Sequence, residues 1–318
     1  INYSIVTHTP SGRRLFGLSL AALASLQWGA QPVILKILVD TLDVYTIGWM
    51  RFTTTAVLLL PLSMSAKGFQ SLKQLNGRGL FLLLICVASL LTNYLTFMAS
   101  LSYISPGSAQ IFMQIGPMLM LVGGLFVFGE TFTRLQWIGC AILIVGLTLF
   151  FSNRFGDLVD DSKPFGFGFT LLIIAALTWA VYLLTQKQLL TLLQPQTILL
   201  CIYSAGAILL FPVIRLTDYA ILEPRHIPLL AATSVLTFSS YLCYANSVKH
   251  VEASRIGVVL SFSPVVVFFM AALFSLFLPD LIEPENLSVA NITGSCLVVA
   301  GSMLGALGNF TNLKKTDS

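Results

Sequence analysis

Ten long apolar stretches constrain the fold of this chain more than any other feature of its sequence. They span residues 15–39, 44–65, 79–101, 105–128, 135–151, 166–187, 195–216, 227–248, 254–278 and 288–307. A membrane-spanning helix needs about 20 mainly apolar residues, which is roughly the length of each stretch. Only 9% of the 318 residues are charged, whereas soluble domains carry about 25%. The sequence therefore predicts an all-α membrane protein with ten transmembrane helices and short loops.

Lysine and arginine gather in alternate loops. With the N-terminus placed in the cytoplasm, the cytoplasmic side collects Arg13, Arg14, Lys67, Lys73, Arg78, Arg134, Lys187, Lys249, Arg255, Lys314 and Lys315. The opposite side has Arg154, Lys163, Arg215 and Arg225. By the positive-inside rule, both termini are predicted to be cytoplasmic.

The two halves of the chain resemble each other. Trp28 and Lys36 share a W-x7-K spacing with Trp179 and Lys187. Further matched pairs, given with the first-half residue first, are Asn93 and Ser240, Tyr94 and Tyr241, Phe97 and Tyr244, Pro117 and Pro264, Gly139 and Gly294, and Gly146 and Gly301. Each half has five predicted helices, an odd number, so the second half enters the membrane from the opposite face. Such inverted-topology repeats are typical of secondary transporters, with the substrate site near the midplane between them. A duplication without a transport role is the alternative.

This pattern divides the chain into five parts. They are a cytoplasmic N-terminal tail (1–14), a first repeat of five helices (15–151), an external linker (152–165), a second repeat of five helices (166–307) and a cytoplasmic C-terminal tail (308–318).

Polar and aromatic residues interrupt several of the apolar stretches. Polar groups are costly in hydrocarbon and usually face the protein interior or a water-filled cavity. Many share one helix face and have a counterpart in the other half, which suggests one aromatic and amide-rich cavity. The candidate substrate-binding residues are Trp28, Gln31, Asn93, Tyr94, Gln110, Gln114, Trp179, Tyr182, Tyr241, Tyr244 and Ser261. As alternatives, the amides bond neighbouring helices and the tryptophans belong to an interfacial belt. Pro32, Pro117 and Pro264 remove backbone hydrogen bonds and are candidate bends for gating.

Three charged residues need a separate interpretation. Lys36 is near the outer end of its helix, where it can snorkel to the headgroups. Arg51 lies about two turns inside the second helix, and Asp40 and Asp43 of the adjacent loop are its candidate partners. A structural anchor is the favoured role of Arg51, and a substrate counter-ion is the alternative. Glu130, at the cytoplasmic end of the fourth helix, is expected to make a local ion pair or helix-end contact. No Asp or Glu falls at mid-membrane depth in the ten stretches, so proton or sodium coupling is unsupported.

Several of these residues form a recognisable series along the chain. The series comprises Trp28-Gly29 to Lys36, Arg51-Phe52, Tyr103-Ile104-Ser105, Pro117, Gly129-Glu130, Gly139 and Gly146. In this order they resemble the EamA branch of the drug/metabolite transporter superfamily, over about residues 15–307. The resemblance implies an inner-membrane carrier of small metabolites, often exporting amino acids, with ten helices in inverted repeats. The second half departs from it, since Leu278-Pro279-Asp280 stands where the first half has Gly129-Glu130.

We therefore expect an exporter of small metabolites, such as neutral or aromatic amino acids, that works by alternating access. A carrier of nucleotide sugars or sugar phosphates would need two or more cavity-facing cations, and a carrier of lipophilic drugs a buried carboxylate or a dense aromatic cage. A non-transporting membrane scaffold gives no reason for matched polar residues. The expected partners are a small-molecule substrate and the lipid bilayer, with no nucleic acid, and the chain is expected to be a monomer or weak homodimer. Neither HExxH nor GxSxG occurs, so we expect no enzyme, cofactor or metal.

Overall fold

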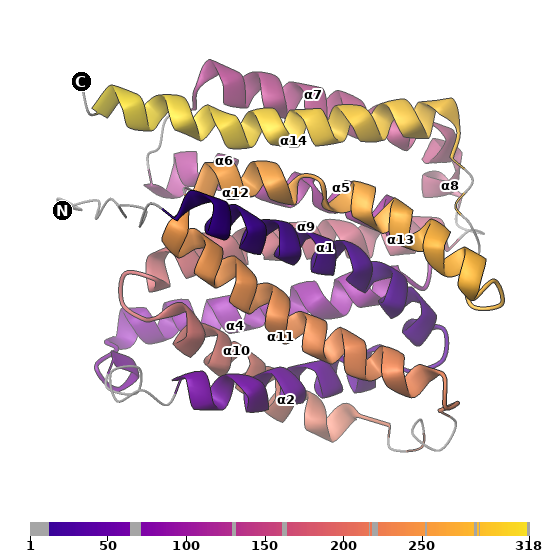
Figure 1. Ribbon diagram of the computed structural model, residues 1–318, viewed down its shortest axis with the longest axis horizontal. Coiled ribbons are helices and arrows are strands. Elements are labelled where there is room, and N and C mark those ends of the chain that lie inside the picture. The colour runs from indigo at the N-terminus through magenta and orange to yellow at the C-terminus, as the bar shows by residue number, and fades with distance from the viewer. Residues whose placement is uncertain are drawn as a thin grey trace.

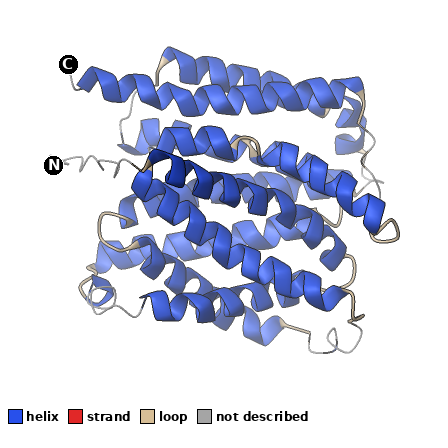
Figure 2. Cartoon of the chain, viewed as in Figure 1, coloured by secondary structure: helices blue, strands red, loops and turns tan. Residues whose placement is uncertain are grey.

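The computed structural model describes residues 13–63, 71–128, 132–160, 164–215, 217, 222–251, 253–282, 285 and 287–316. Within these residues the chain consists of helices joined by loops (Figure 2). The helices of the first half are α1 (Arg14–Val39), α2 (Val44–Ser63), α4 (Gly77–Ser100), α5 (Pro106–Met113), α6 (Ile115–Phe128) and α7 (Arg134–Phe150). A short 3-10 turn (Ser152–Arg154) and α8 (Phe155–Val159) follow. The second half contains α9 (Phe165–Leu189), α10 (Pro195–Leu210), a 3-10 turn (Phe211–Val213), α11 (His226–His250), α12 (Ala253–Leu260), α13 (Ser263–Phe277) and α14 (Val289–Thr316).

The length and hydropathy of these helices identify an integral membrane protein. In the described part of the chain, 8 segments can cross a membrane, or 9 if α7 and the bent segment after it form one span. The 20-residue α2 is not among them. Arg51 and three successive threonines, 53–55, lower its hydropathy, which accounts for one span fewer than the sequence predicted. The other difference is α7, which has 17 residues and counts as a span only together with the bent segment after it.

Two of the predicted helices are interrupted at matching positions. The stretch 105–128 divides into α5 and α6 at Gln114, and the stretch 254–278 divides into α12 and α13 at residues 261–262. In a continuous helix a proline ring clashes with the carbonyl four residues earlier. That residue is Met113 for Pro117 and Leu260 for Pro264, the last residues of α5 and α12. The two prolines thus end a helix, as expected for bends, whereas Pro32 lies inside the continuous α1.

The helices pair in a pattern that repeats when the halves are exchanged. The α1–α11 contact has its counterpart in α9–α4, and α1–α13 has its counterpart in α9–α6. The pairs α2–α10 and α7–α14 each join equivalent helices of the two halves. Figure 1 shows α7 and α14 along one edge of the bundle and α2 and α10 at the opposite edge. The first turn of α1 and the last turn of α14 lie on the same side of the molecule (Figure 1).

Glycines let α7 and α14 pack backbone against backbone. A Cβ at Gly301 would lie 2.6 Å from the carbonyl oxygen of Gly139 and 2.6 Å from the amide nitrogen of Leu143. A Cβ at Gly146 would lie 2.7 Å from the amide nitrogen of Val298 and 2.9 Å from the carbonyl oxygen of Gly294. We call this contact of Gly139, Gly146, Gly294 and Gly301 the glycine seam. The internal repeat of the sequence matched these four glycines, and the structure shows that they let α7 and α14 pack closely.

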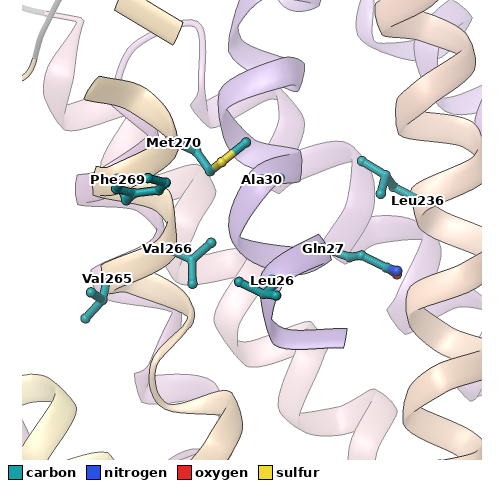
Figure 3. A pocket seen from close by; sticks show the side chains of 8 residues that line it. All are labelled: Leu26, Gln27, Ala30, Leu236, Val265, Val266, Phe269 and Met270. Carbon is teal, nitrogen blue, oxygen red and sulfur yellow. The ribbon is translucent and has the colours of Figure 1, made fainter. Parts of the chain in front are cut away.

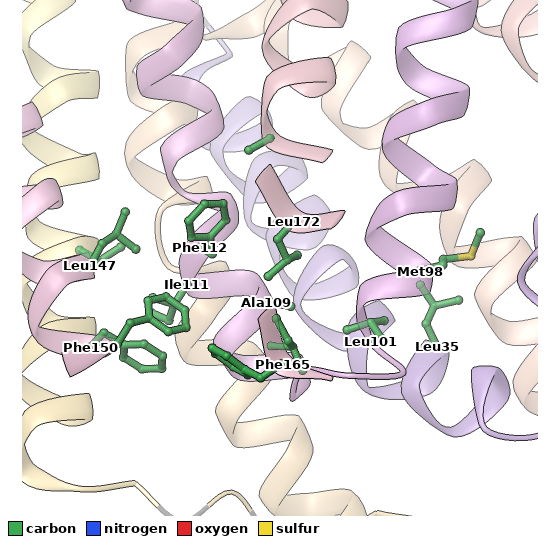
Figure 4. Close-up of a cluster of buried hydrophobic side chains, with 14 of the residues drawn as sticks. Leu35, Met98, Leu101, Ala109, Ile111, Phe112, Leu147, Phe150, Phe165 and Leu172 are labelled. Carbon is green, nitrogen blue, oxygen red and sulfur yellow. The ribbon is translucent and has the colours of Figure 1, made fainter. Parts of the chain in front are cut away.

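Large apolar side chains close the end of the bundle opposite the start of α1. Figure 4 shows Phe112 of α5, Phe150 of α7 and Leu172 of α9 in one buried cluster, with Leu35 from the last turns of α1. Since these residues come from both halves, the cluster holds the two halves together at this end.

The predicted boundaries differ from the structure at two places. The predicted linker 152–165 contains α8, and α14 continues to Thr316 through the predicted C-terminal tail. Residues 1–12 and Glu130 lie outside the described residues, so the structure assigns them nothing.

Candidate functional site

Arg51 is the most deeply buried charged residue described. It projects from α2, and 1% of its surface is exposed. Its Nε and Nη2 donate to the hydroxyl of Thr237 on α11, over 3.1 and 2.9 Å, and Nη2 also donates to Oε1 of Gln31 on α1 over 2.9 Å. Nη1 faces the sulfur of Met98 on α4 at 3.3 Å. Four helices from both halves therefore meet around one cation.

The acids proposed as partners of Arg51 are engaged elsewhere, which corrects the sequence interpretation. Asp40 pairs with Lys36 at 3.0 Å. Asp43 accepts from the amides of Tyr45 and Thr46 at the start of α2, over 2.9 and 3.1 Å. None of the ion pairs in the described residues involves Arg51, whose bonding partners there are all neutral.

Six aromatic side chains form one cluster of touching rings that reaches this cation through Tyr94, and we call them the aromatic group. They are Trp28 of α1, Phe52 of α2, Tyr94 of α4, Tyr203 of α10, and Tyr241 and Tyr244 of α11. The guanidinium carbon of Arg51 lies 4.9 Å from the ring centroid of Tyr94, a cation–π contact. The hydroxyls of Tyr94 and Tyr203 are 3.0 Å apart. The ring centroid of Trp28 lies 5.5 Å from those of Tyr241 and Tyr244. Because the rings touch, they fill the space between the helices in this conformation.

A second polar cluster joins the two helix interruptions. Nε2 of Gln114 donates to the carbonyl of Ser261 over 3.3 Å, and these residues are 147 positions apart, the offset that aligns the halves here. Ser302 of α14 donates to Oε1 of Gln114 and accepts from the hydroxyl of Ser261. Gln110 donates to Ser263 over 3.0 Å. A carbonyl released by a helix interruption is thus bonded by a side chain of the other half.

The remaining predicted site residues make separate contacts. Nδ2 of Asn93 donates to the carbonyl of Ala175 over 2.9 Å, and so joins α4 to α9. Trp179 contacts the ring of the buried Tyr182, with their centroids 5.2 Å apart. Lys36 is half-buried and pairs with Asp40, in agreement with a location near the outer end of α1.

Sequence reasoning missed four residues that the structure places at these two clusters: Phe52, Tyr203, Thr237 and Ser302. The 151-residue offset that relates Trp28 to Trp179 also relates Phe52 to Tyr203, so the repeat contained that signal. Thr237 and Ser302 are small hydroxyl residues that occur throughout membrane helices, and nothing in the pattern distinguished them.

An open groove lies on another face of α1. It has a volume of about 480 Å³. Figure 3 shows side chains of α1, α11 and α13 along it, with Gln27 the polar member. The Oε1 of Gln27 accepts from Ser239 over 3.0 Å. The other residues that line the groove are apolar, as suits a surface in contact with lipid.

Comparison with known proteins identifies the family. Residues 15–152 and residues 166–307 each match the EamA-like transporter family. The chain belongs to the EamA-like transporter family. The two matches show that this EamA protein contains two copies of the family unit, close to the halves inferred from its internal similarity.

Relatives of this EamA protein cover almost its whole length. An uncharacterized transporter of Haemophilus influenzae is 31% identical over 296 residues, which are 93% of this chain and 96% of the relative. The uncharacterized inner membrane transporter YhbE of Escherichia coli K12 is 28% identical over 92% of each chain. A crystal structure described only as that of a protein has a TM-score of 0.61 at 14% identity, and it covers 96% of this chain and 100% of its own. At this level of identity, the similarity shows only that the two chains share a fold.

Proposed function

We propose that this EamA protein is a secondary transporter that exports small metabolites, such as neutral or aromatic amino acids, by alternating access. The observation that carries the proposal is the cluster of Arg51, Gln31 and the aromatic group, which both halves supply. Polar residues inside a membrane bundle mark transport pathways. Aromatic faces suit the apolar part of a metabolite, and amides and hydroxyls suit its polar part.

The proposed architecture is ten transmembrane helices in two inverted five-helix repeats. It is supported by the exchange pattern, in which α1–α11 in one half corresponds to α9–α4 in the other. The matched interruptions at Gln114 and Ser261 support it as well, because discontinuous helices at the repeat interface are typical of such carriers. In this proposal, α2 and α7 with its bent continuation supply the remaining spans.

We also propose that the protein lies in a bacterial inner membrane with both termini in the cytoplasm. The relative YhbE is named an inner membrane transporter. The ends of α1 and α14 on one side of the bundle agree with an even number of crossings (Figure 1), and the lysine and arginine count orients that side. The apolar cluster of Figure 4 then closes the outer end, so substrate enters from the cytoplasmic side.

A transporter of nucleotide sugars or sugar phosphates receives less support. Such substrates carry two or more negative charges, and Arg51 is the cation at the centre of the described helices, whereas Lys36 is neutralised by Asp40.

Efflux from proteoliposomes tests the proposal. The purified protein is reconstituted into liposomes. These are loaded with a labelled aromatic, aliphatic or basic amino acid, a sugar phosphate or a lipophilic cation, and each solute is measured with and without a pH gradient. We expect saturable efflux of neutral or aromatic amino acids that does not depend on the gradient. Gln114→Ala should abolish it, while the matched control Gln27→Ala, which alters an amide at the lipid-facing groove, should not. Folded protein that moves none of these solutes would contradict the proposal.

A further inference from the structure

Arg51 is a buried cation whose neighbours do not neutralise it. A buried charge without a counter-ion is strongly unfavourable, and arginine does not lose its proton in proteins. The described contacts of Arg51 are a threonine hydroxyl, an amide oxygen, a thioether sulfur and a tyrosine ring. Since none of these groups is an acid, an anion that binds beside Arg51 would be stabilised by its positive charge.

The unused donors around Arg51 lie close together. Nε and Nη2 have oxygen acceptors, but the partner of Nη1 is the sulfur of Met98, which is a weak acceptor. Oε1 of Gln31 bonds to Nη2, so Nε2 of the same amide lies beside the guanidinium. This nitrogen is buried and has no hydrogen-bond partner, and Gln31 is 7% exposed. An unsatisfied buried donor next to an unneutralised cation indicates a missing acceptor with negative charge.

We propose that the guanidinium of Arg51 and the amide of Gln31 bind the carboxylate of a transported substrate. A carboxylate has two oxygens in one plane and matches the forked donors of arginine. One cation matches one carboxylate and leaves a phosphate dianion with excess charge. The inference rests on the proposed transport function and names its substrate class: small molecules with a carboxylate beside an apolar or aromatic moiety.

The aromatic group fits the rest of such a substrate. Tyr94 lies directly against the guanidinium, and its ring centroid lies 6.5 Å from that of Tyr241, which in turn contacts Trp28. A molecule whose carboxylate reaches Arg51 therefore lies between aromatic faces from α1, α4 and α11. Since these rings touch one another here, entry requires them to separate, a movement that alternating access of the two halves supplies.

The direct test is carboxylate-dependent thermal stabilisation of the full-length purified protein. The probes are phenylalanine and leucine, each compared with its own amide, which lacks the carboxylate charge. We expect the two acids to raise the unfolding temperature and the two amides to leave it unchanged. Arg51→Gln should weaken the response to the acids at least about tenfold in concentration, and Arg51→Lys should keep part of it. Lys36→Gln, which removes the cation paired with Asp40, should keep all of it.

Gln31→Glu provides a variant that does not depend on the choice of probe. A glutamate at this position would place an internal carboxylate against Arg51. If Arg51 lacks a counter-ion until substrate binds, this variant should unfold at a temperature at least as high as the wild type and should no longer respond to acids. A Gln31→Glu protein that responds like the wild type would overturn the inference.

Three further results would also overturn it: equal responses to acid and amide, a full response in Arg51→Gln, and a wild-type protein that responds to neither acid. Flux is measured separately. Carboxylate-dependent stabilisation without flux would support the site and contradict the transporter proposal, whereas flux of acids and amides alike would support the transporter and contradict the site.

Discussion

The two halves of the chain contribute equivalent residues to the glycine seam but not to the surroundings of Arg51. At the seam, both halves contribute the same residue type at matching positions, and the backbones touch through Gly139, Gly146, Gly294 and Gly301. Around Arg51 the equivalence fails, because the offset that relates Phe52 to Tyr203 relates Arg51 to Ile202. The cation thus belongs to one half alone.

This difference separates two tasks of the molecule. A symmetric contact between equivalent helices gives both halves the same scaffold, and the backbones there leave no room for a Cβ. The asymmetric centre keeps an unneutralised cation and an unsatisfied amide, which do not help folding. Binding sites often carry such destabilising features, because the ligand supplies what the fold leaves out. The seam should therefore control stability, and the centre should control substrate selectivity.

Breaking the seam should have the largest effect on stability. Gly301→Ala places a methyl group 2.6 Å from backbone atoms of Gly139 and Leu143, and backbone cannot move aside as a side chain can. We expect a loss of about 1–3 kcal/mol in the free energy of unfolding, the usual cost of overpacking. Thermal unfolding in detergent measures it. Gly77→Ala is the control, since a Cβ there meets nothing within 4 Å, and an equal loss in both variants would contradict the account.

A half-buried carboxylate in the connection between α13 and α14 offers a sharper contrast with Arg51. Oε1 of Glu285 accepts from the amide of Gly107 near the start of α5, over 2.7 Å. Burial raises the pKa of Glu285, although the bonds from Gly107 and Ser105 act against that rise. An acid with a raised pKa contributes stability at low pH, and the contribution disappears as pH rises through the folded-state pKa.

The unfolding temperature of the wild type should accordingly include a step that falls as pH rises from just above 4. Glu285→Gln keeps an oxygen acceptor for Gly107 and should lack this step. The control is Glu223→Gln, which changes an exposed carboxylate paired with Arg225. If Glu285→Gln and the wild type share the same pH profile, the carboxylate does not titrate with folding.

The smallest effect is expected from Lys36→Gln. Its ion pair with Asp40 is solvent-accessible and joins residues four apart on one helix. Such pairs contribute about 0.2–1 kcal/mol. We expect the unfolding temperature to change little and the selectivity between acids and amides to remain. A loss of selectivity comparable to that of Arg51→Gln would show that the two cations act together.

The sequence predicted much of this arrangement because the relevant signals are periodic. Apolar stretches predicted most of the helices, and the repeat matched the seam glycines. The offset that matched Pro117 with Pro264 also aligns Gln114 with Ser261. The prolines predicted where the helices break. They did not predict that the two breaks are bonded to each other. That contact depends on how the fourth and ninth helices pack, which no local pattern specifies.

The environment of Arg51 was the main point that the sequence did not give. Chain proximity suggested Asp40 and Asp43 as partners, since both precede α2 within a few residues. The structure shows the opposite geometry: α2 carries Arg51 inward to Thr237, which is 186 residues away in the chain. Long-range helix packing decides which charges are neutralised, and it turned an expected anchor into a candidate counter-ion.

Arg51→Met tests the central claim most directly, by efflux of phenylalanine from proteoliposomes made with protein whose unfolding temperature is known. Methionine has an unbranched apolar side chain that can fill much of the same space, and apolar replacement of buried charges is often neutral or stabilising. The account predicts efflux no faster than from protein-free liposomes, with an unfolding temperature equal to or above that of the wild type. Efflux at the wild-type rate, or a loss of stability as large as that of Gly301→Ala, would show that Arg51 is a structural anchor.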